Sequence, residues 1–330
     1  KENYLYLLLI KTFSYLNKSQ HLSLTHISSA YSYLYVNFSY FYDKERNLRS
    51  TSMKTEKYLL VGAIWALLCS SCGNTSQKET KNIQETMAFV TTDTTVKDSL
   101  QLIWIRDNAK ERIMPLSLFG ELPLPLIDSL DIQNGVLASI STFLLETNGQ
   151  YILFDTGVGA PDSRLIPGLA AAGLSPTDID YIYLTHFHGD HIGGMMKEDS
   201  VVFPNAEVYA ARAEYDGWMQ MPEEKKAQVT RTMTAYQDRL HLFEYGDTFP
   251  ANVVAMEAIG HTPGHTVYQV GGFLIVGDLV HGAALQLPHP EYCAAYDMDP
   301  EAAIQTRTHY LKYAKDNNLL MAGMHQPVEQ

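Results

Sequence analysis

The chain has 330 residues, enough for one large domain or two small ones. Its hydrophobic share of 46% and charged share of 18% are typical of a globular protein. The formal net charge of −13 argues against a nucleic-acid backbone as partner, because proteins that bind one need a basic surface.

The cysteines also exclude two classes of site. There are three of them, and Cys69 and Cys72 fall in a segment that resembles a processing signal, which leaves Cys293 in the body of the chain. We therefore expect neither a disulfide framework nor a cysteine-based zinc site in the folded part.

Residues 1–52 differ from the rest in composition. They are dense in Tyr, Ser and Leu, and the first Met of the chain is Met53. We interpret residues 1–52 as a non-native extension upstream of the true start. The alternative is a genuine aromatic-rich N-terminal domain.

Residues 53–72 have the layout of a bacterial lipoprotein signal peptide. Lys54 and Lys57 supply the positive end, and Tyr58–Leu68 supply an apolar core that is too short to span a bilayer. Small residues precede Cys72, which is the predicted lipid-bearing residue. The prediction is a protein anchored by lipid in the bacterial cell envelope, facing the periplasm or the cell surface.

Residues 73–98 are rich in Thr, Ser, Lys, Gln and Glu and are interpreted as a flexible tether. Residues 99–330 are then the folded domain. Its apolar pattern begins with an expected strand at Leu100–Ile105. Met114–Asp131 carries Pro123 and Pro125 and predicts an irregular excursion, either a loop over the active site or a connection.

Asn148-Gly149 between two β-rich runs predicts a hairpin, because this dipeptide favours the tight turn that joins antiparallel strands. Ser175 and Pro176 predict a helix start. The alternation of expected strands and helices indicates a layered α/β domain. Further strands are expected at Tyr181–Leu184, Glu207–Ala210, Val253–Ile259, Thr266–Val270, Phe273–Val276 and Leu319–Ala322, and helices at Ala211–Trp218, Glu223–Arg239 and from Asp299 to about Lys315.

The motif most informative about function is Thr185-His186-Phe187-His188-Gly189-Asp190-His191. It follows a short apolar strand, and strand alternation places His186 and His188 on one side. Neutral imidazoles and a carboxylate suit zinc and similar divalent ions. A solvated polar loop is the alternative, and it is disfavoured because the whole chain has only 12 His.

Three other segments offer further donors at strand ends, which are rigid places for ligands. Gly260-His261-Thr262-Pro263-Gly264-His265 forms a tight turn between two expected strands and aims one His inward. Asp278 ends one strand and His325 ends another. Each of them taken alone is more often a structural residue, but together and in this order they point to a metal site.

The ordered set of these motifs resembles the metallo-β-lactamase superfamily over roughly residues 100–325. The resemblance implies a four-layer αβ/βα sandwich with two divalent metal ions, zinc being the first candidate, at the sheet edges. It implies that metal one is held by His186, His188 and His265, and metal two by Asp190, His191 and His325. Asp278 would bridge the ions, Asp155 would support the ligands from behind, and His261 would be structural.

Looser matches resemble the branch that holds methyl parathion hydrolase and lactonase-like enzymes. His188 argues against a flavodiiron-type oxidoreductase, which has Glu there, and Asp278 against the classical B1 β-lactamases, which usually have Cys. The chain stops five residues after His325, where relatives usually run on, which predicts a missing C-terminal strand or helix. The looser matches are Phe203–Tyr209, Trp218, His281, Gln286 and Pro290–Tyr292.

The implied reaction is hydrolysis of an ester, lactone or phosphotriester by a hydroxide that bridges the two ions. Asp190 is the expected catalytic residue, orienting the hydroxide and passing a proton to the leaving group. Trp218 is a candidate wall of the substrate pocket, and the alternative is that it packs in the core. His281 is a candidate polar contact to the substrate, and the alternative is that it lies in a surface turn.

Five alternatives stay open. A phosphodiesterase or a β-lactam hydrolase could use the same scaffold, and a single-iron glyoxalase or persulfide-oxidising enzyme could use part of the ligand set. A surface lipoprotein could also keep a ligand site without catalysis, although a complete ligand set argues against it. Zinc, manganese, cobalt and iron all accept His and Asp ligands, so the sequence does not select the metal.

Overall fold

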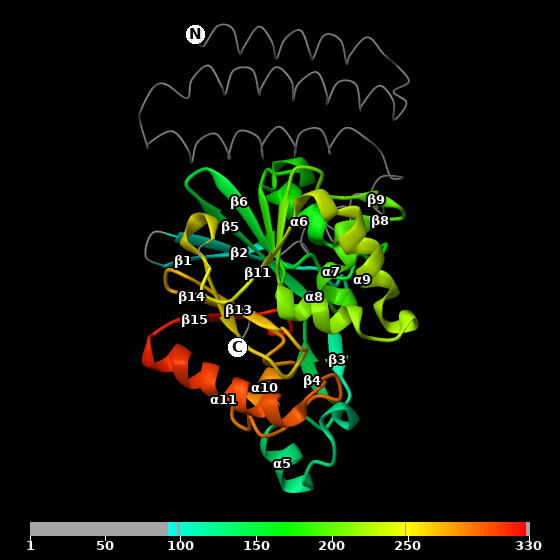
Figure 1. Cartoon of the computed structure of the whole chain (residues 1–330). Helices are drawn as coiled ribbons and strands as arrows, with labels where there is room; N and C mark the ends of the chain where they lie inside the picture. Colours follow the sequence, from blue (N-terminus) through cyan, green and yellow to red (C-terminus); the bar gives the residue numbers. More distant parts are fainter. Residues whose placement is uncertain (1–91, 98–99, 248, 328–330) are drawn as a thin grey trace, which may run out of the picture. The chain divides into compact units, whose positions relative to one another are not determined.

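The computed structural model describes residues 92–97, 100–247 and 249–327 (Figure 1). The upstream extension at 1–52 and the signal peptide with Cys72 lie outside these residues. Among the described residues, no helix has the length and apolarity that crossing a membrane requires.

The larger sheet has seven strands in the order β1-β2-β5-β6-β7-β10-β11. Neighbours pair antiparallel from β1 to β6 and parallel from β6 to β11. The predicted hairpin is confirmed between β5 and β6, with Asn148 and Gly149 both at positive φ. The strands are β1 (Thr92–Lys97), β2 (Leu100–Arg106), β5 (Ser141–Thr147), β6 (Gln150–Phe154), β7 (Tyr181–Tyr183), β10 (Glu207–Ala211) and β11 (Leu240–Phe243).

The edge strand β1 corrects the tether prediction at its C-terminal end. Residues 92–97 pair antiparallel along the whole of β2 instead of remaining unstructured. The segment has three Thr and one Val, which favour strands, and β2 offers it an edge with unpaired main-chain groups.

The smaller sheet has four strands in the order β12-β13-β14-β15. The first two pairings are antiparallel, and β14 pairs with β15 in parallel, with an irregularity near Gly277. This irregularity lies where β14 delivers Asp278 to the site. The strands are β12 (Val254–Glu257), β13 (Thr266–Val270), β14 (Phe273–Gly277) and β15 (Leu320–Gly323).

Strand alternation sorts the core into layers. On β2, Leu102 and Trp104 pack between the two sheets, whereas Ile105 packs against the helices on the outer face of the large sheet. On β14, Ile275 faces the space between the sheets and Val276 the helix beyond. The order helix, sheet, sheet, helix confirms the predicted four-layer sandwich.

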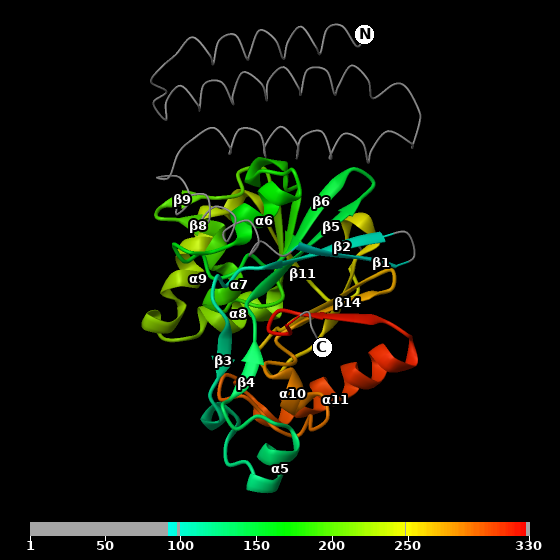
Figure 2. The same ribbon diagram turned by 180° about the vertical axis from the view of Figure 1, so that it is seen from behind.

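The two helical layers are visible on opposite sides in both views (Figures 1 and 2). Helices α6 (Leu165–Ala171) and α9 (Glu223–Ala235) pack on the large sheet, and α11 (Pro300–Asp316) packs on the small one. The predicted start of a helix at Ser175 produces only a three-residue 3-10 turn with a capping box. The remaining short helices are α7 (Gly189–Ile192), α8 (Arg212–Met219) and α10 (Ala283–Gln286).

The predicted excursion at Met114–Asp131 is a small lobe beside the sandwich. It contains α5 (Leu124–Ser129) and is joined to the rest by a two-stranded ribbon of β3 (Arg112–Met114) and β4 (Val136–Ala138). Phe119 and Val136 pack with Leu285 of α10 in a satellite core. A second short ribbon pairs β8 (Met196–Lys197) with β9 (Ser200–Val201).

Candidate metal centre

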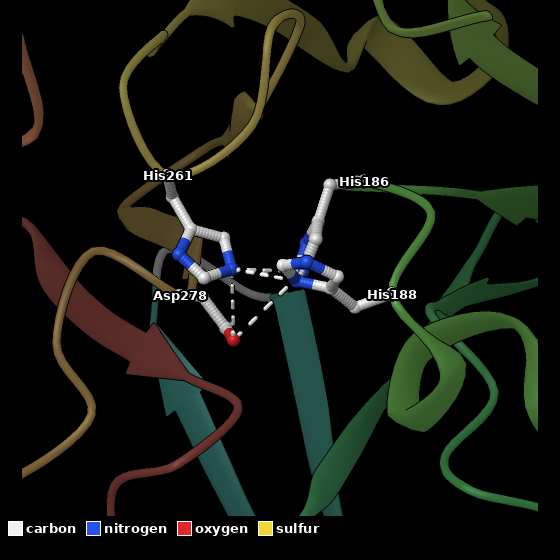
Figure 3. Close-up of side chains that lie close together, drawn as sticks. All are labelled: His186, His188, His261 and Asp278. Carbon is white, nitrogen blue, oxygen red and sulfur yellow. Dashed lines mark hydrogen bonds and ion pairs between the residues drawn. The ribbon is translucent and has the colours of Figure 1, made fainter. Parts of the chain in front are cut away.

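The first group of potential metal donors gathers where the loop after β7 meets the ends of the small sheet. Its nitrogens form a triangle: His186 Nε2 lies 3.0 Å from His188 Nδ1, and His261 Nε2 lies 2.9 Å from His188 Nδ1 and 3.2 Å from His186 Nε2. Asp278 Oδ2 lies 3.4 Å from His261 Nε2 and 3.8 Å from His186 Nε2. Figure 3 shows all four side chains converging.

These separations match the geometry of a tetrahedral zinc site. Zn–N distances of about 2.0–2.1 Å set the ligand nitrogens roughly 3.3 Å apart. The three nitrogens lie 2.9–3.2 Å apart, and their lone pairs need a shared partner, because three neutral imidazoles cannot all donate to one another. The group therefore fits one divalent ion.

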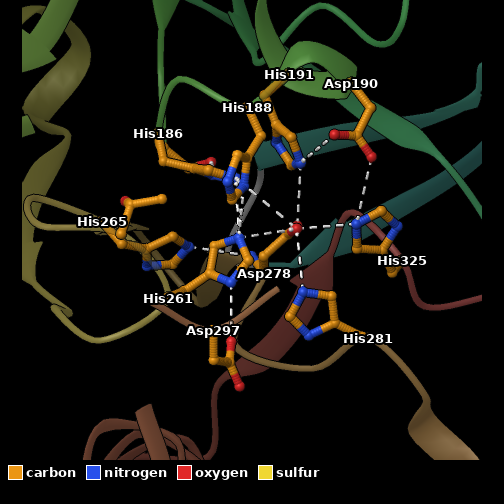
Figure 4. Close-up of polar contacts among 12 residues, drawn as sticks. His186, His188, Asp190, His191, His261, His265, Asp278, His281, Asp297 and His325 are labelled. Atoms are coloured by element: carbon orange, nitrogen blue, oxygen red, sulfur yellow. Dashed lines mark hydrogen bonds and ion pairs between the residues drawn. The ribbon is translucent and has the colours of Figure 1, made fainter. Parts of the chain in front are cut away.

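A second group of donors shares Asp278 with the first. Its carboxylate lies 3.2 Å from His191 Nε2 through Oδ1 and 2.9 Å from His325 Nε2 through Oδ2. Asp190 lies 3.8 Å from His191 Nε2 and 3.6 Å from His325 Nε2 (Figure 4). His191 Nε2 and Asp278 Oδ1 are buried and make no hydrogen bond within the described residues, which fits a second divalent ion.

Two histidines of the turn before β13 lie in different surroundings. His261 lies in the first group, whereas His265, predicted as the ligand, accepts a hydrogen bond at Nε2 from the Asp278 amide, 3.1 Å away. His265 immediately precedes β13 and packs against the exit of β14, where Gly277 leaves room: a Cβ there would lie 2.6 Å from His265 Nε2. The ligand role of His265 and the structural role of His261 stay predictions, because proximity alone does not test them.

Most of the imidazoles in these groups are held through their other nitrogen, which fixes the ring and its tautomer. His191 Nδ1 lies 2.7 Å from the carboxylate of Asp155, and His325 Nδ1 donates to the Ser139 carbonyl, 2.7 Å away. Asp155 also accepts from the amide and hydroxyl of Thr185, both at 2.7 Å. Asp155 thus supports the ligand loop from behind, as the resemblance implies.

A buried carboxylate that the sequence analysis missed connects the two loops of the first group. Glu214 of α8 accepts hydrogen bonds from Phe187 N at 2.9 Å and Trp218 Nε1 at 2.7 Å. It also accepts from Thr262 Oγ1 at 2.7 Å and Gly264 N at 2.8 Å. Although these bonds favour the ionised form, burial raises the pKa of Glu214. No local pattern marks it, since its partners lie up to 50 residues away.

Burial sets the protonation of the first group in the metal-free protein. It lowers the pKa of His188 and His261 to about 4 and that of His186 well below the ordinary value of 6.5. Neutral imidazole is the form that binds metal. At neutral pH the first group is therefore ready to bind.

The second group differs in charge. Burial by itself lowers the pKa of His191 and His325, but the neighbouring carboxylates, Asp278 foremost, raise both above the ordinary value. Burial raises the pKa of Asp278, yet His191 and His325 bring it well below its usual range. Metal uptake by the second group therefore displaces protons.

The predicted substrate contacts lie beside the donors. Trp218 is only 6% exposed and packs in the core, with its ring edge-on to His188 at 5.6 Å, so its role as a substrate wall stays a prediction. His281 is fully buried, stacks on His325 at 5.4 Å and lies 3.4 Å from Asp278 Oδ2 through Nε2. Neither nitrogen of His281 makes a hydrogen bond within the described residues. The complete burial of His281 excludes the alternative that it lies in a surface turn.

A model of the metallo-beta-lactamase superfamily matches residues 136–325, which include every donor of both groups. The chain belongs to the metallo-beta-lactamase superfamily. Relatives in this superfamily include a probable metallo-hydrolase of Methanocaldococcus jannaschii, 32% identical over 102 residues that cover 30% of this chain and 48% of that protein. Hydroxyacylglutathione hydrolase of Edwardsiella ictaluri is 29% identical over 42% of this chain and 46% of that protein. The match to these relatives spans about half of their length.

Solved structures of the superfamily match more of the chain. AidC, a dizinc quorum-quenching lactonase solved with a product, has a TM-score of 0.67 and 25% identity over 73% of this chain and 92% of that chain. The hydrolase AbOPH has a TM-score of 0.63 and 28% identity over 72% of this chain and 90% of that chain. These names agree with the predicted class of metal-dependent hydrolase.

Proposed function

We propose that the chain is a two-metal hydrolase of small esters, with lactones as the first substrate class and phosphotriesters as the second. The observation that carries the proposal is the pair of donor groups that share Asp278 (Figure 4). The similarity to a dizinc lactonase supports the choice of substrate and of zinc.

The residues that would hold the ions follow from the two groups. His186 and His188 would hold one ion together with the predicted ligand His265 or its neighbour His261. Asp190, His191 and His325 would hold the other ion, and Asp278 would contact both. When bound, the ions would polarise the scissile carbonyl or phosphoryl group and lower the pKa of a water molecule to about 7.

Asp190 has the exposure that a proton-transferring residue needs. Its side chain is 25% exposed, whereas those of Asp278 and His325 are each 3% exposed. Its carboxylate therefore faces the open side of the site, where it can orient the attacking water and accept its proton. The same oxygen can then return the proton to the leaving oxygen of the ester.

The loop after α10 supplies groups suited to the rest of a small apolar ester. Tyr296 is 42% exposed, and its ring lies 5.8 Å from that of His281. Large exposed apolar side chains near a polar centre favour an acyl or aryl substituent. His281 Nε2 is our candidate donor to the substrate oxygen.

The test combines metal analysis with hydrolysis of a panel of lactones, aryl esters, phosphotriesters and β-lactams. We expect about two ions per wild-type chain, and a fall in kcat of about 10²–10⁴-fold in Asp190→Ala on the best substrate. Asp199→Ala, which alters an exposed carboxylate, is the matched control. Equal rates for wild type and Asp190→Ala on every hydrolysed substrate would refute the role of Asp190, and one iron per chain would favour the oxidase alternative.

Attachment to a bacterial membrane through a lipid on Cys72 stays a proposal from the sequence. It would place the enzyme in the cell envelope, where it would meet small neutral esters that diffuse through the outer layers.

A further inference from the structure

Helix α7 carries two donors of the second group, Asp190 and His191, yet it is only four residues long. The last carbonyls of a helix lack partners inside the helix, and in a single turn this includes most of them. Thr156 provides the missing partner: its amide and its hydroxyl both donate to the His191 carbonyl, each at 2.8 Å. Thr156 and His191 are fully buried, so the segment after β6 takes the place of water in holding the helix.

Glycines bring this segment into direct backbone contact with the chain that leaves α7. Gly194 N donates to the Gly157 carbonyl at 3.2 Å. A Cβ on Gly193 would lie 2.2 Å from the Val158 carbonyl oxygen, and one on Gly194 would lie 2.0 Å from that of Thr156. Because the two backbones touch, a shift of the segment after β6 displaces the chain next to α7.

Asp107 fixes the segment in turn. It directly follows strand β2, is 0% exposed, and its Oδ2 accepts a hydrogen bond from Val158 N at 2.9 Å. Its Oδ1 accepts from the amides of Arg164 and Leu165, both at 3.1 Å, and from the hydroxyl of Ser163. One carboxylate therefore ties the large sheet both to the segment behind α7 and to the start of α6.

We infer that Thr156 and Asp107 are positioning residues for one ion selectively, the ion that Asp190, His191 and His325 would hold (Figure 4). Thr156 acts on the main chain of His191, and Asp107 acts by fixing the segment to which Thr156 belongs. The inference rests on the proposed function, because it requires this group to bind a divalent ion.

The selectivity follows from the separate supports of the other donor loop. Phe187 N donates to Glu214 at 2.9 Å, and Thr185 Oγ1 lies 3.0 Å from His186 Nδ1. These supports come from α8 and from the chain after β7, and not from the segment after β6. A shift of that segment should therefore move His191 more than His186.

A purely structural role predicts a different pattern. Loss of a buried hydrogen bond lowers stability wherever it occurs, and it would weaken both ions alike or neither. Groups that orient metal ligands from behind, in contrast, change metal affinity by a factor of about 10–100. A comparison of the two metal affinities in one variant therefore separates the two roles.

The test uses Thr156→Val and Asp107→Asn in the full chain. Thr156→Val keeps the shape of the side chain and the amide bond to His191 but loses the hydroxyl. An amide at 107 has one acceptor oxygen. When that oxygen serves the start of α6, the NH₂ group faces Val158 N–H, so two donors meet and the bond to the segment behind α7 is lost.

Three reference variants accompany these changes. Thr156→Ser restores the hydroxyl donor without the methyl group, so it should bind both ions like the wild type. Ser163→Ala removes the hydroxyl that donates to the other oxygen of Asp107, on the α6 side, and should also keep both affinities. His325→Ala removes one donor of the second group and so identifies the affinity that belongs to this group.

The measurements are zinc affinity by competition with a chromophoric chelator and the visible absorption of the cobalt(II)-substituted protein. In Thr156→Val we expect the affinity identified by His325→Ala to fall about tenfold, the cobalt spectrum to change and the other affinity to stay constant. Asp107→Asn should weaken the same ion by a smaller factor, because it acts through the segment and not on His191 itself.

The outcomes separate the possibilities. Two unchanged zinc affinities in a folded Thr156→Val variant would overturn the inference, as would an equal loss of both ions or the same loss in Thr156→Ser. If Thr156→Val does not fold, Asp107→Asn decides by the same criterion. A wild-type chain that binds fewer than two divalent ions would instead refute the proposed function on which the inference rests.

Discussion

Glu214 gives the sharpest test of how the fold builds the site. Its carboxylate accepts four hydrogen bonds, from Phe187 N, Trp218 Nε1, Thr262 Oγ1 and Gly264 N. Two of these donors belong to the loop and helix on the His188 side and two to the turn that carries His261. Glu214 is 1% exposed, so water cannot replace a lost acceptor.

Glu214→Gln keeps the size of the side chain but leaves one oxygen. The amide oxygen can still serve one pair of donors, and the NH₂ group then meets the other pair. Two hydrogen bonds are lost and one backbone amide is left without an acceptor, which should lower the free energy of unfolding by about 2–4 kcal/mol. For a domain of this size the unfolding temperature should fall by roughly 5–15 °C.

The assay is thermal and denaturant unfolding of the metal-free protein, followed by zinc titration. Glu224→Gln, at an exposed position of α9, is the control. We also expect weaker binding of the ion at His261, because both loops of that group lose their common anchor. A change of less than about 0.5 kcal/mol would refute the reasoning, since that is the range of ordinary surface substitutions.

Two further predictions concern packing and protons. In Gly264→Ala the new Cβ would lie 2.1 Å from the Glu214 amide nitrogen and 2.6 Å from the Glu214 Cα. We therefore expect the free energy of unfolding, measured with denaturant, to fall by about 3 kcal/mol or more. An unchanged denaturation midpoint would show that the turn moves freely. At pH 7, filling the Asp190–His191–His325 group should release more protons than filling the other, because the pKa values of His191 and His325 are raised and those of His188 and His261 are lowered. Calorimetry in buffers of different ionisation enthalpy measures this release, and equal release in the two steps would contradict the assigned protonation states.

Much of the site follows from short-range pattern. The spacing of His186, His188, Asp190 and His191 after an apolar strand predicts their convergence, because strand end and turn geometry are local. Asp278 and His325 are likewise predictable as residues at the ends of adjacent strands, β14 and β15. The layered α/β fold follows from the alternation of elements.

The different surroundings of His261 and His265 could not be predicted from the sequence. Both flank the same Thr-Pro-Gly turn, and both are buried, so neither pattern nor polarity separates them. His261 is directed by Asp297, which is 36 residues away, whereas His265 is held by the amide of Asp278. The first strand β1 was missed for a similar reason: a polar Thr-rich segment pairs only because β2 offers an edge.

Because the donors are divided between the two sheets, the ions can bind tightly only after the sheets have docked. His186, His188 and His191 follow strand β7 of one sheet, and His261, Asp278 and His325 belong to the ends of the other. Each ion of the proposed site would then add about 1.4 kcal/mol to folding stability for every tenfold rise in free metal above its dissociation constant. The stability of the proposed enzyme would therefore rise with the metal supply of its surroundings, and metal starvation would make the folded protein easier to unfold.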